Sequence, residues 1–304
     1  MICLGNVEYL TNNFKLALEW FDDALRLLRQ RKEFELSVCK VLLRKAISFD
    51  KLGEYSRSIE CFGEVLKLGR RLWGPNHPEL SNVLNSLGNV HRNQGELRRA
   101  LRCYEECLRI RSQADDVLGV ASTKNNIGAI FASMEQVERS RQFYAESLRV
   151  KTEILGSVHI DTARTLYNMG QLYVTDRQFN SALSFLEESL RVFKLNLGEN
   201  HNEVAACLCS IGTVHDETMD EELALSYFKR ALTAVKGQGG SRAVKAQALH
   251  NVGIILTKRN DIDHAVRIFR EALEMKQNSI DAEDKSDTQY CLANVLRLTG
   301  CTSE

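Results

Sequence analysis

The feature that most constrains this sequence is a repeat of about 41 residues that runs along nearly the whole chain. One position of the repeat holds a small residue, and its eight occurrences are Gly5, Ala46, Gly88, Gly128, Gly170, Gly212, Gly253 and Ala293. A leucine stands twenty positions after each of the first seven, as Leu25, Leu66, Leu108, Leu148, Leu190, Leu232 and Leu273. Because two independent ladders share one register, we predict stacked copies of a single structural unit.

Each unit is predicted to be a pair of antiparallel helices. A second small residue follows the first after twelve positions, as Ala17, Ser58, Ala100, Ser140, Ala182, Ala224 and Ala265. A bulky residue follows four positions later, as Phe21, Phe62, Tyr104, Tyr144, Leu186, Phe228 and Phe269. Small residues allow helices to approach closely, and bulky ones fill the space between them. Replacing Gly170 with leucine should therefore overpack the contact, at a cost of roughly 1–3 kcal/mol.

Composition argues against several classes of protein. Lys and Arg total 40 and Asp and Glu total 40, so the formal net charge is zero, which argues against a general binder of nucleic acid. No apolar stretch approaches the length that spans a bilayer, and the first five residues do not form a secretion signal. The nine cysteines form no secreted-type framework. We expect a reducing, cytoplasmic location, with the cytoskeleton as one candidate association.

The spacing small–x11–small–x3–aromatic resembles the tetratricopeptide repeat family along almost the entire chain. The period here exceeds the 34 residues typical of that family. Three connections, 73–78 (WGPNHP), 155–159 (LGSVH) and 197–201 (LGENH), resemble the kinesin light chain and nephrocystin-like branch. The third and sixth repeats lack this connection and look more like the G-protein-regulator type. No heptad seam precedes the first repeat, so the coiled coil that joins kinesin light chains to the motor is absent from this sequence.

The resemblance implies an all-α fold, a right-handed superhelical α-solenoid of tetratricopeptide-type helical hairpins. We predict a single solenoid over residues 1–304, with about seven helix pairs and a C-terminal capping helix at 286–298. Gly5 has four residues before it where about seven are expected, which predicts that the chain begins inside a helix.

Motifs that would carry chemistry are weak in this sequence. The glycine-rich segment 237–240 follows a helix and lacks a closing Lys-Ser/Thr pair, so we interpret it as a linker rather than a phosphate-binding loop. Cys103 with Cys107, and Cys207 with Cys209, do not have the spacing of strong zinc sites. His77, His159 and His201 could be metal ligands, or loop residues that help to start the following helix. We predict no catalytic residue, no metal and no cofactor, and hence no enzyme.

The resemblance places a peptide-binding surface on the concave side, where the first helix of each hairpin faces inward. Mapped onto this sequence, it predicts twelve binding residues: Asn82, Asn85, Asn89, Arg92, Asn125, Asn126, Arg164, Asn168, Gln171, Gln247, Asn251 and Lys258. Asparagine is a poor helix former, yet its amide can both donate to and accept from the backbone of an extended peptide. Alternatively, these asparagines bond to neighbouring helices and complete the solenoid.

We therefore predict a monomeric scaffold or adaptor that binds short peptide segments of other proteins, acidic segments among them. A regulatory solenoid within a larger signalling or enzyme protein is the alternative, and a longer gene product would distinguish the two. RNA binding by helical repeats is a third possibility that the neutral charge disfavours.

Overall fold

The computed structural model describes residues 1–30, 32–237, 240–276 and 282–298, and within these ranges the chain is helical with no strand. The α-helices are α1 (Ile2–Leu10), α2 (Phe14–Leu28), α3 (Glu35–Lys51), α4 (Tyr55–Trp73), α5 (Pro78–Asn93), α6 (Leu97–Gln113), α7 (Val117–Ser133), α8 (Val137–Leu155), α9 (Ile160–Thr175), α10 (Phe179–Leu197), α11 (Asn202–Glu217), α12 (Glu221–Ala234), α13 (Arg242–Lys258), α14 (Ile262–Lys276) and α15 (Ala282–Leu298). A short 3₁₀ helix, Lys32–Phe34, precedes α3. The all-α prediction is confirmed.

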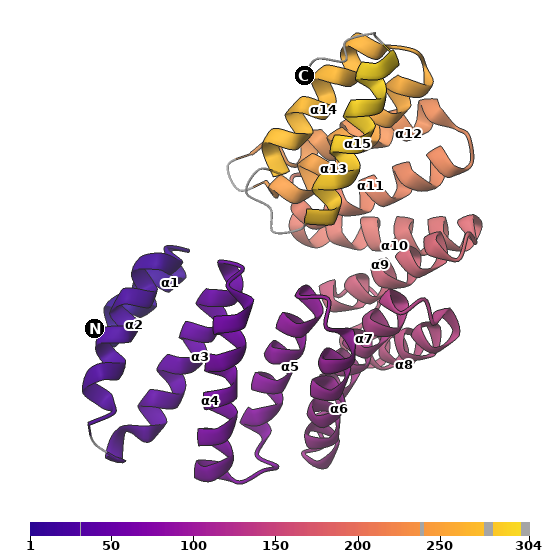
Figure 1. The fold of residues 1–304 in the computed structure, drawn as a ribbon. Coiled ribbons are helices and arrows are strands. Elements are labelled where there is room, and N and C mark those ends of the chain that lie inside the picture. Colours follow the sequence, from indigo (N-terminus) through magenta and orange to yellow (C-terminus); the bar gives the residue numbers. More distant parts are fainter. Residues whose placement is uncertain (31, 238–239, 277–281, 299–304) are drawn as a thin grey trace. The chain divides into compact units, whose positions relative to one another are not determined.

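The chain divides into two compact units, unit 1 at residues 1–150 and unit 2 at residues 151–304. Unit 1 holds the hairpins α1–α2, α3–α4 and α5–α6, followed by α7 and the start of α8 (Figure 1). Unit 2 holds the end of α8, the hairpins α9–α10, α11–α12 and α13–α14, and then α15. Within each unit, odd-numbered helices are the first helices of a repeat and even-numbered helices are the second. That one solenoid extends over the whole chain stays a prediction.

The small and bulky residues of the repeat interlock as their spacing predicts. A Cβ atom added to Gly88 would lie 2.6 Å from the ring of Tyr104, sixteen residues later. The same close approach recurs at five other repeats, for Gly5, Gly128, Gly170, Gly212 and Gly253. All seven residues at the second small position are completely buried. The repeat register is therefore confirmed by packing.

Serine at the second small position forms a specific hydrogen bond. Ser58 Oγ donates to the carbonyl oxygen of Ala46, and Ser140 Oγ donates to that of Gly128, both at 2.8 Å. Each acceptor is the first small residue of the same repeat. Because both serines are fully buried, these bonds remove the cost of an unpaired hydroxyl.

The three histidines in the connections cap the helices that follow them. Nδ1 of His77, His159 and His201 accepts the backbone N–H two residues later, at the starts of α5, α9 and α11. This confirms the interpretation of the three histidines as loop residues that help to start the following helix. Where the histidine is missing, Asp116 caps α7 and Ser241 caps α13 with a side-chain oxygen.

Candidate peptide-binding face

All twelve predicted binding residues lie on first helices, and they divide evenly between the two units. Unit 1 carries six of them on α5 and α7, and unit 2 carries six on α9 and α13. We call the surface formed by these registers the first-helix face of each unit. Whether the two faces form one groove, and whether they bind a peptide, stays a prediction.

In unit 1, three of the predicted asparagines accept hydrogen bonds from the protein itself. Asn126 Nδ2 donates to Asn85 Oδ1 at 2.9 Å, and the Tyr104 hydroxyl donates to Asn89 Oδ1 at 2.6 Å. Arg111 donates to Asn82 Oδ1 at 3.0 Å. The amide NH2 groups of Asn82, Asn85 and Asn89 have no acceptor within the described part of the chain. The packing role of these residues and a binding role therefore use different atoms of the same side chains.

In unit 2, the charged candidates are occupied by ion pairs within their own helix or with the neighbouring first helix. Arg164 Nε lies 2.7 Å from Glu203, and its NH1 lies 3.0 Å from Asp161. Lys258 Nζ lies 2.6 Å from Asp216 Oδ1. A ligand carboxylate would have to displace these partners, so this face is less suited to acidic segments than the sequence predicts.

The uncharged candidates of unit 2 include residues with internal partners. Gln171 Nε2 donates to the hydroxyl of Tyr167 at 2.9 Å, and Asn251 Nδ2 donates to Thr213 Oγ1 at 3.5 Å. Asn168 also has a partner within the chain, as does Asn125 in unit 1. Gln247 is exposed and forms no hydrogen bond among the described residues. The alternative interpretation, in which the amides complete the solenoid, therefore accounts for part of the pattern.

An apolar socket lies on the same face of unit 1, one repeat before the asparagines. Its volume is about 260 Å³, and it is lined by Leu36, Cys39, Lys40, Leu43, Val65, Trp73, His77, Glu79 and Val83. Lys40 and Leu43 stand six and three positions before Ala46, in the registers that Asn82 and Asn85 occupy relative to Gly88. Applying those registers to the second repeat would have placed Lys40 and Leu43 on this face, but it would not have shown the socket, which α4 and α5 also line.

Asp50 also lies on this face and was not among the residues predicted from the sequence. It stands four positions after Ala46, in the register that Arg92 occupies in the next repeat. Its Oδ1 atom is buried and accepts no hydrogen bond in the structure. Burial raises the pKa of its carboxyl group, although Lys51, Asn93 and Arg92 oppose this. Because this oxygen is buried, it is not accessible to a ligand, whereas Arg92 makes no ion pair in the described part of the chain.

Unit 2 contains a comparable socket of about 210 Å³ between α13, α14 and α15. It is lined by Ile254, Thr257, Lys258, Phe269, Cys291, Asn294 and Val295. Ile254 and Asn294 each follow the small residue of their repeat by one position, as Asn89 and Gln171 do. Each unit therefore has an apolar socket with a lysine at its edge.

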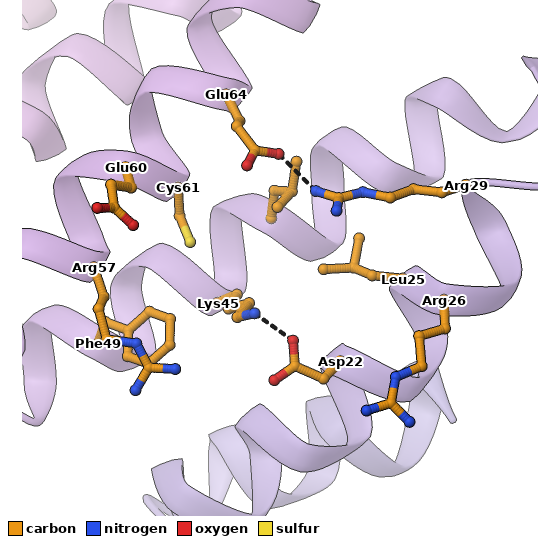
Figure 2. Close-up of a pocket in the computed structure, with 11 residues that line it drawn as sticks. Asp22, Leu25, Arg26, Arg29, Lys45, Phe49, Arg57, Glu60, Cys61 and Glu64 are labelled. Atoms are coloured by element: carbon orange, nitrogen blue, oxygen red, sulfur yellow. Dashed lines mark hydrogen bonds and ion pairs between the residues drawn. The ribbon is translucent and has the colours of Figure 1, made fainter.

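A larger pocket of about 520 Å³ lies between α2, α3 and α4 in unit 1 (Figure 2). Most of its charged groups have partners within the protein. Lys45 pairs with Asp22, Arg29 pairs with Glu64 at 2.6 Å, and the Arg57 guanidinium lies 4.1 Å from the centroid of the Phe49 ring. This matching leaves the pocket without a dominant charge, and we assign it no ligand.

The buried cysteines of the described residues behave as packing residues rather than nucleophiles. Burial raises the pKa of Cys103 to about 11 and that of Cys207 and Cys209 to about 12, so their thiols are protonated at neutral pH.

Among the described residues, no three His, Cys, Asp or Glu side chains are grouped as metal ligands. None of the helices in that part of the chain is long and apolar enough to cross a membrane. Part of the glycine-rich segment 237–240 lies outside the described residues.

These pKa values predict loss of stability in alkali. Groups whose folded pKa is raised contribute stability that is complete below the unfolded value of 9 and is lost as pH rises through the folded value. We expect the free energy of unfolding to fall above pH 9 by about 1.4 kcal/mol per pH unit for each of Cys207 and Cys209. Lys151, whose pKa burial lowers, acts in the opposite direction but is a single group.

Urea unfolding between pH 7 and 11 measures this slope. The double variant Cys207→Ala with Cys209→Ala should show a shallower decrease, whatever its stability at pH 7. Equal slopes for the variant and the wild type would contradict the prediction.

Comparison with known proteins decides the family. The sequence model of the family described as "Tetratricopeptide repeat" matches residues 37–113, 119–194, 177–237 and 220–278, which together span most of the chain. The chain belongs to the tetratricopeptide repeat family. Such repeats generally mediate contacts between proteins, and they typically serve as non-enzymatic scaffolds. No curated protein sequence matches the chain.

Solved structures show the same fold at low sequence identity. BtubC (BKLC) from P. vanneervenii is 19% identical with a TM-score of 0.58, over 74% of this chain and 89% of that one. A putative kinesin light chain of Podosopora anserina, with nearly identical TPR-like repeats, is 11% identical with a TM-score of 0.53, over 68% of this chain and 99% of that one. The apo form of RapI is 12% identical with a TM-score of 0.60, over 86% and 98%. These likenesses concern the fold alone, and the kinesin light chain-like branch stays a prediction.

Proposed function

We propose that this tetratricopeptide protein is a scaffold or adaptor whose first-helix faces bind extended segments of other proteins. The observation that carries the proposal is the arrangement on unit 1. There, an apolar socket, the unpaired Arg92 and three amide NH2 groups occupy equivalent registers of α3 and α5. An extended peptide needs this combination, because its backbone carbonyls require donors while its side chains require sockets.

Charge favours acidic segments on unit 1 rather than on unit 2. Lys40, Arg44 and Arg92 outnumber Asp50 and Glu79 among the charged residues that α3 and α5 place at this face of unit 1. On unit 2, Arg164 and Lys258 are already paired with acidic residues. A carboxylate placed beside Arg92 would gain a charge-assisted hydrogen bond without breaking an existing pair.

A monomer in the cytoplasm is part of the proposal. The eight cysteines of the described residues are all unbonded thiols, which supports a reducing compartment. Light scattering on the purified chain would test the monomeric state.

Selection from a displayed random-peptide library, followed by fluorescence anisotropy with the selected peptides, tests the binding face. We expect Leu36→Asp, which places a charge at the edge of the socket, to weaken binding about tenfold or more because an apolar contact is lost. Arg92→Glu should weaken acidic peptides further and reduce the dependence of affinity on salt. Asn126→Ala with Asn168→Ala should cost about 1 kcal/mol for each hydrogen bond lost.

Leu72→Asp is the matched control, because Leu72 is similarly exposed but lies near the end of the second helix α4, outside the socket. Its affinity should equal that of the wild type. If no peptide is enriched, or if Leu36→Asp and Arg92→Glu bind as the wild type does, the first-helix face of unit 1 is not the binding surface.

A further inference from the structure

The repeats are joined by two chemically different kinds of junction. At each junction we compare two residues. One stands 23 positions after the small residue, at or near the end of the second helix, and the other stands five positions before the next small residue, on the next first helix. Three junctions pair a basic residue with threonine: Arg111 with Thr123, Lys151 with Thr165, and Lys276 with Thr288. The other four pair an uncharged residue with an apolar one: Leu28 with Val41, Gly69 with Val83, Phe193 with Cys207, and Val235 with Ala248. No junction mixes the two kinds.

The basic residue contacts the threonine at every polar junction. Arg111 NH1 donates to Thr123 Oγ1 at 2.9 Å, Lys151 Nζ donates to Thr165 Oγ1 at 3.0 Å, and Lys276 Nζ donates to Thr288 Oγ1 at 2.9 Å. Lys151 and Lys276 are only 5% and 2% exposed, and all three threonines are completely buried. These contacts are therefore part of the core between repeats rather than surface pairs.

The surroundings of the first two polar junctions repeat the same triangle of hydrogen bonds. Thr123 Oγ1 donates to the carbonyl oxygen of Gly119 at 2.8 Å, and Arg111 donates to the same oxygen at 2.9 Å. Thr165 Oγ1 donates to the carbonyl oxygen of Asp161 at 3.2 Å, and Lys151 donates to it at 3.4 Å. The threonine proton is thus directed into its own helix, which leaves its lone pairs facing the cation.

We propose that these pairs are a stacking code that restricts which repeat can pack on which. A second helix that carries the buried cation needs the threonine hydroxyl as an acceptor, because a buried cation with too few acceptors is strongly unfavourable. At the third polar junction, Thr288 Oγ1 also lies 3.0 Å from His250 Nδ1. Stacked on an apolar first helix such as α11, with Cys207 at this position, the cation would lose the acceptor that the threonine hydroxyl supplies. The third, fourth and seventh repeats can then be followed only by a repeat whose first helix carries threonine. The fourth, fifth and eighth repeats all carry this threonine, so any of them could follow a repeat with the buried cation. The code therefore restricts the order of the repeats along the chain without specifying it completely.

The two kinds of mismatch differ in their energetic cost. An unmatched threonine can still donate to its own helix, whereas an unmatched buried cation cannot satisfy its donors. The proposal therefore predicts a specific order of effects at the junction between Lys151 and Thr165. Thr165→Val, which removes the closer of the two acceptors of Lys151, should be the most destabilising change. Lys151→Met should be mild, and Lys151→Met with Thr165→Val should recover because it recreates an apolar junction.

Hydrogen exchange of the α9 amides in the whole chain measures this junction. We expect Thr165→Val to lower the protection of these amides about tenfold, as expected for one unsatisfied buried donor. The double variant should return to within about threefold of the Lys151→Met variant. If the two substitutions are additive, so that the double variant is no better protected than Thr165→Val, the code is wrong.

The apolar junction between Phe193 and Cys207 provides the reverse test. Phe193→Lys alone should reduce the protection of α11 strongly, and adding Cys207→Thr should restore part of it by creating a polar pair of similar volume. Cys207→Thr alone should have little effect, because the new hydroxyl can bond to its own helix. If Phe193→Lys does not fold, recovery of folding by Cys207→Thr supports the code. The absence of any rescue overturns it.

Discussion

Gly170→Leu is expected to lower the free energy of unfolding by about 3 kcal/mol, at the upper end of the range for overpacked cores. A Cβ atom at Gly170 would lie 2.6 Å from Leu186 Cγ and 3.3 Å from the backbone nitrogen of Leu186. A side chain can move by changing rotamer, but the backbone of α10 moves only if the whole hairpin separates. Gly170→Ala should cost less, because the second repeat tolerates Ala46 in the same register.

Urea unfolding followed by circular dichroism measures this effect. Gly63→Ala is the matched control, since Gly63 is an exposed helical glycine with no atom within 4 Å of its added Cβ. It should stabilise the chain by up to about 1 kcal/mol through helix propensity alone. Because repeats couple only to their neighbours, the Gly170→Leu transition should also broaden. An unchanged midpoint would show that the predicted close contact is absent.

Arg111→Met is expected to cost about 3 kcal/mol, more than Lys151→Met, because Arg111 bonds to two first helices at once whereas Lys151 bonds to one. Arg111 contacts Ser81 and Asn82 on α5, and it contacts Gly119 and Thr123 on α7. Arg111→Lys should lose about half as much, since lysine can reach Thr123 and Gly119 as Lys151 reaches Thr165 and Asp161, but lacks the fork that also holds α5.

The conservative variant separates the two roles of Arg111. Thermal or urea unfolding should rank wild type above Arg111→Lys, and Arg111→Lys above Arg111→Met. Both variants release Asn82 Oδ1 from its internal donor, so peptide affinity at the first-helix face should change in both, independently of stability. Equal stability of the lysine and methionine variants would show that the contacts with α7 contribute little.

Local periodicity allowed much of the fold to be predicted. The small and bulky ladders correctly predict which residues are buried, including Tyr104 and Phe228, because a hairpin of two helices brings positions sixteen apart into contact whatever surrounds it. The histidine caps were equally predictable, since a cap involves residues only two positions apart.

Contacts between repeats depended on the tertiary structure. The sequence placed Asn85, Asn126 and Arg164 on first helices, but it did not show that Asn126 donates to Asn85 or that Arg164 pairs with Glu203. These partners are about 40 residues apart, and their pairing depends on the offset and twist between neighbouring hairpins. The socket beside Leu43 and the buried position of Lys151 have the same origin. The sequence alone thus determined the hairpin and its register. Only the tertiary structure decided which polar groups remain available to a ligand, because those groups are distributed by packing between repeats.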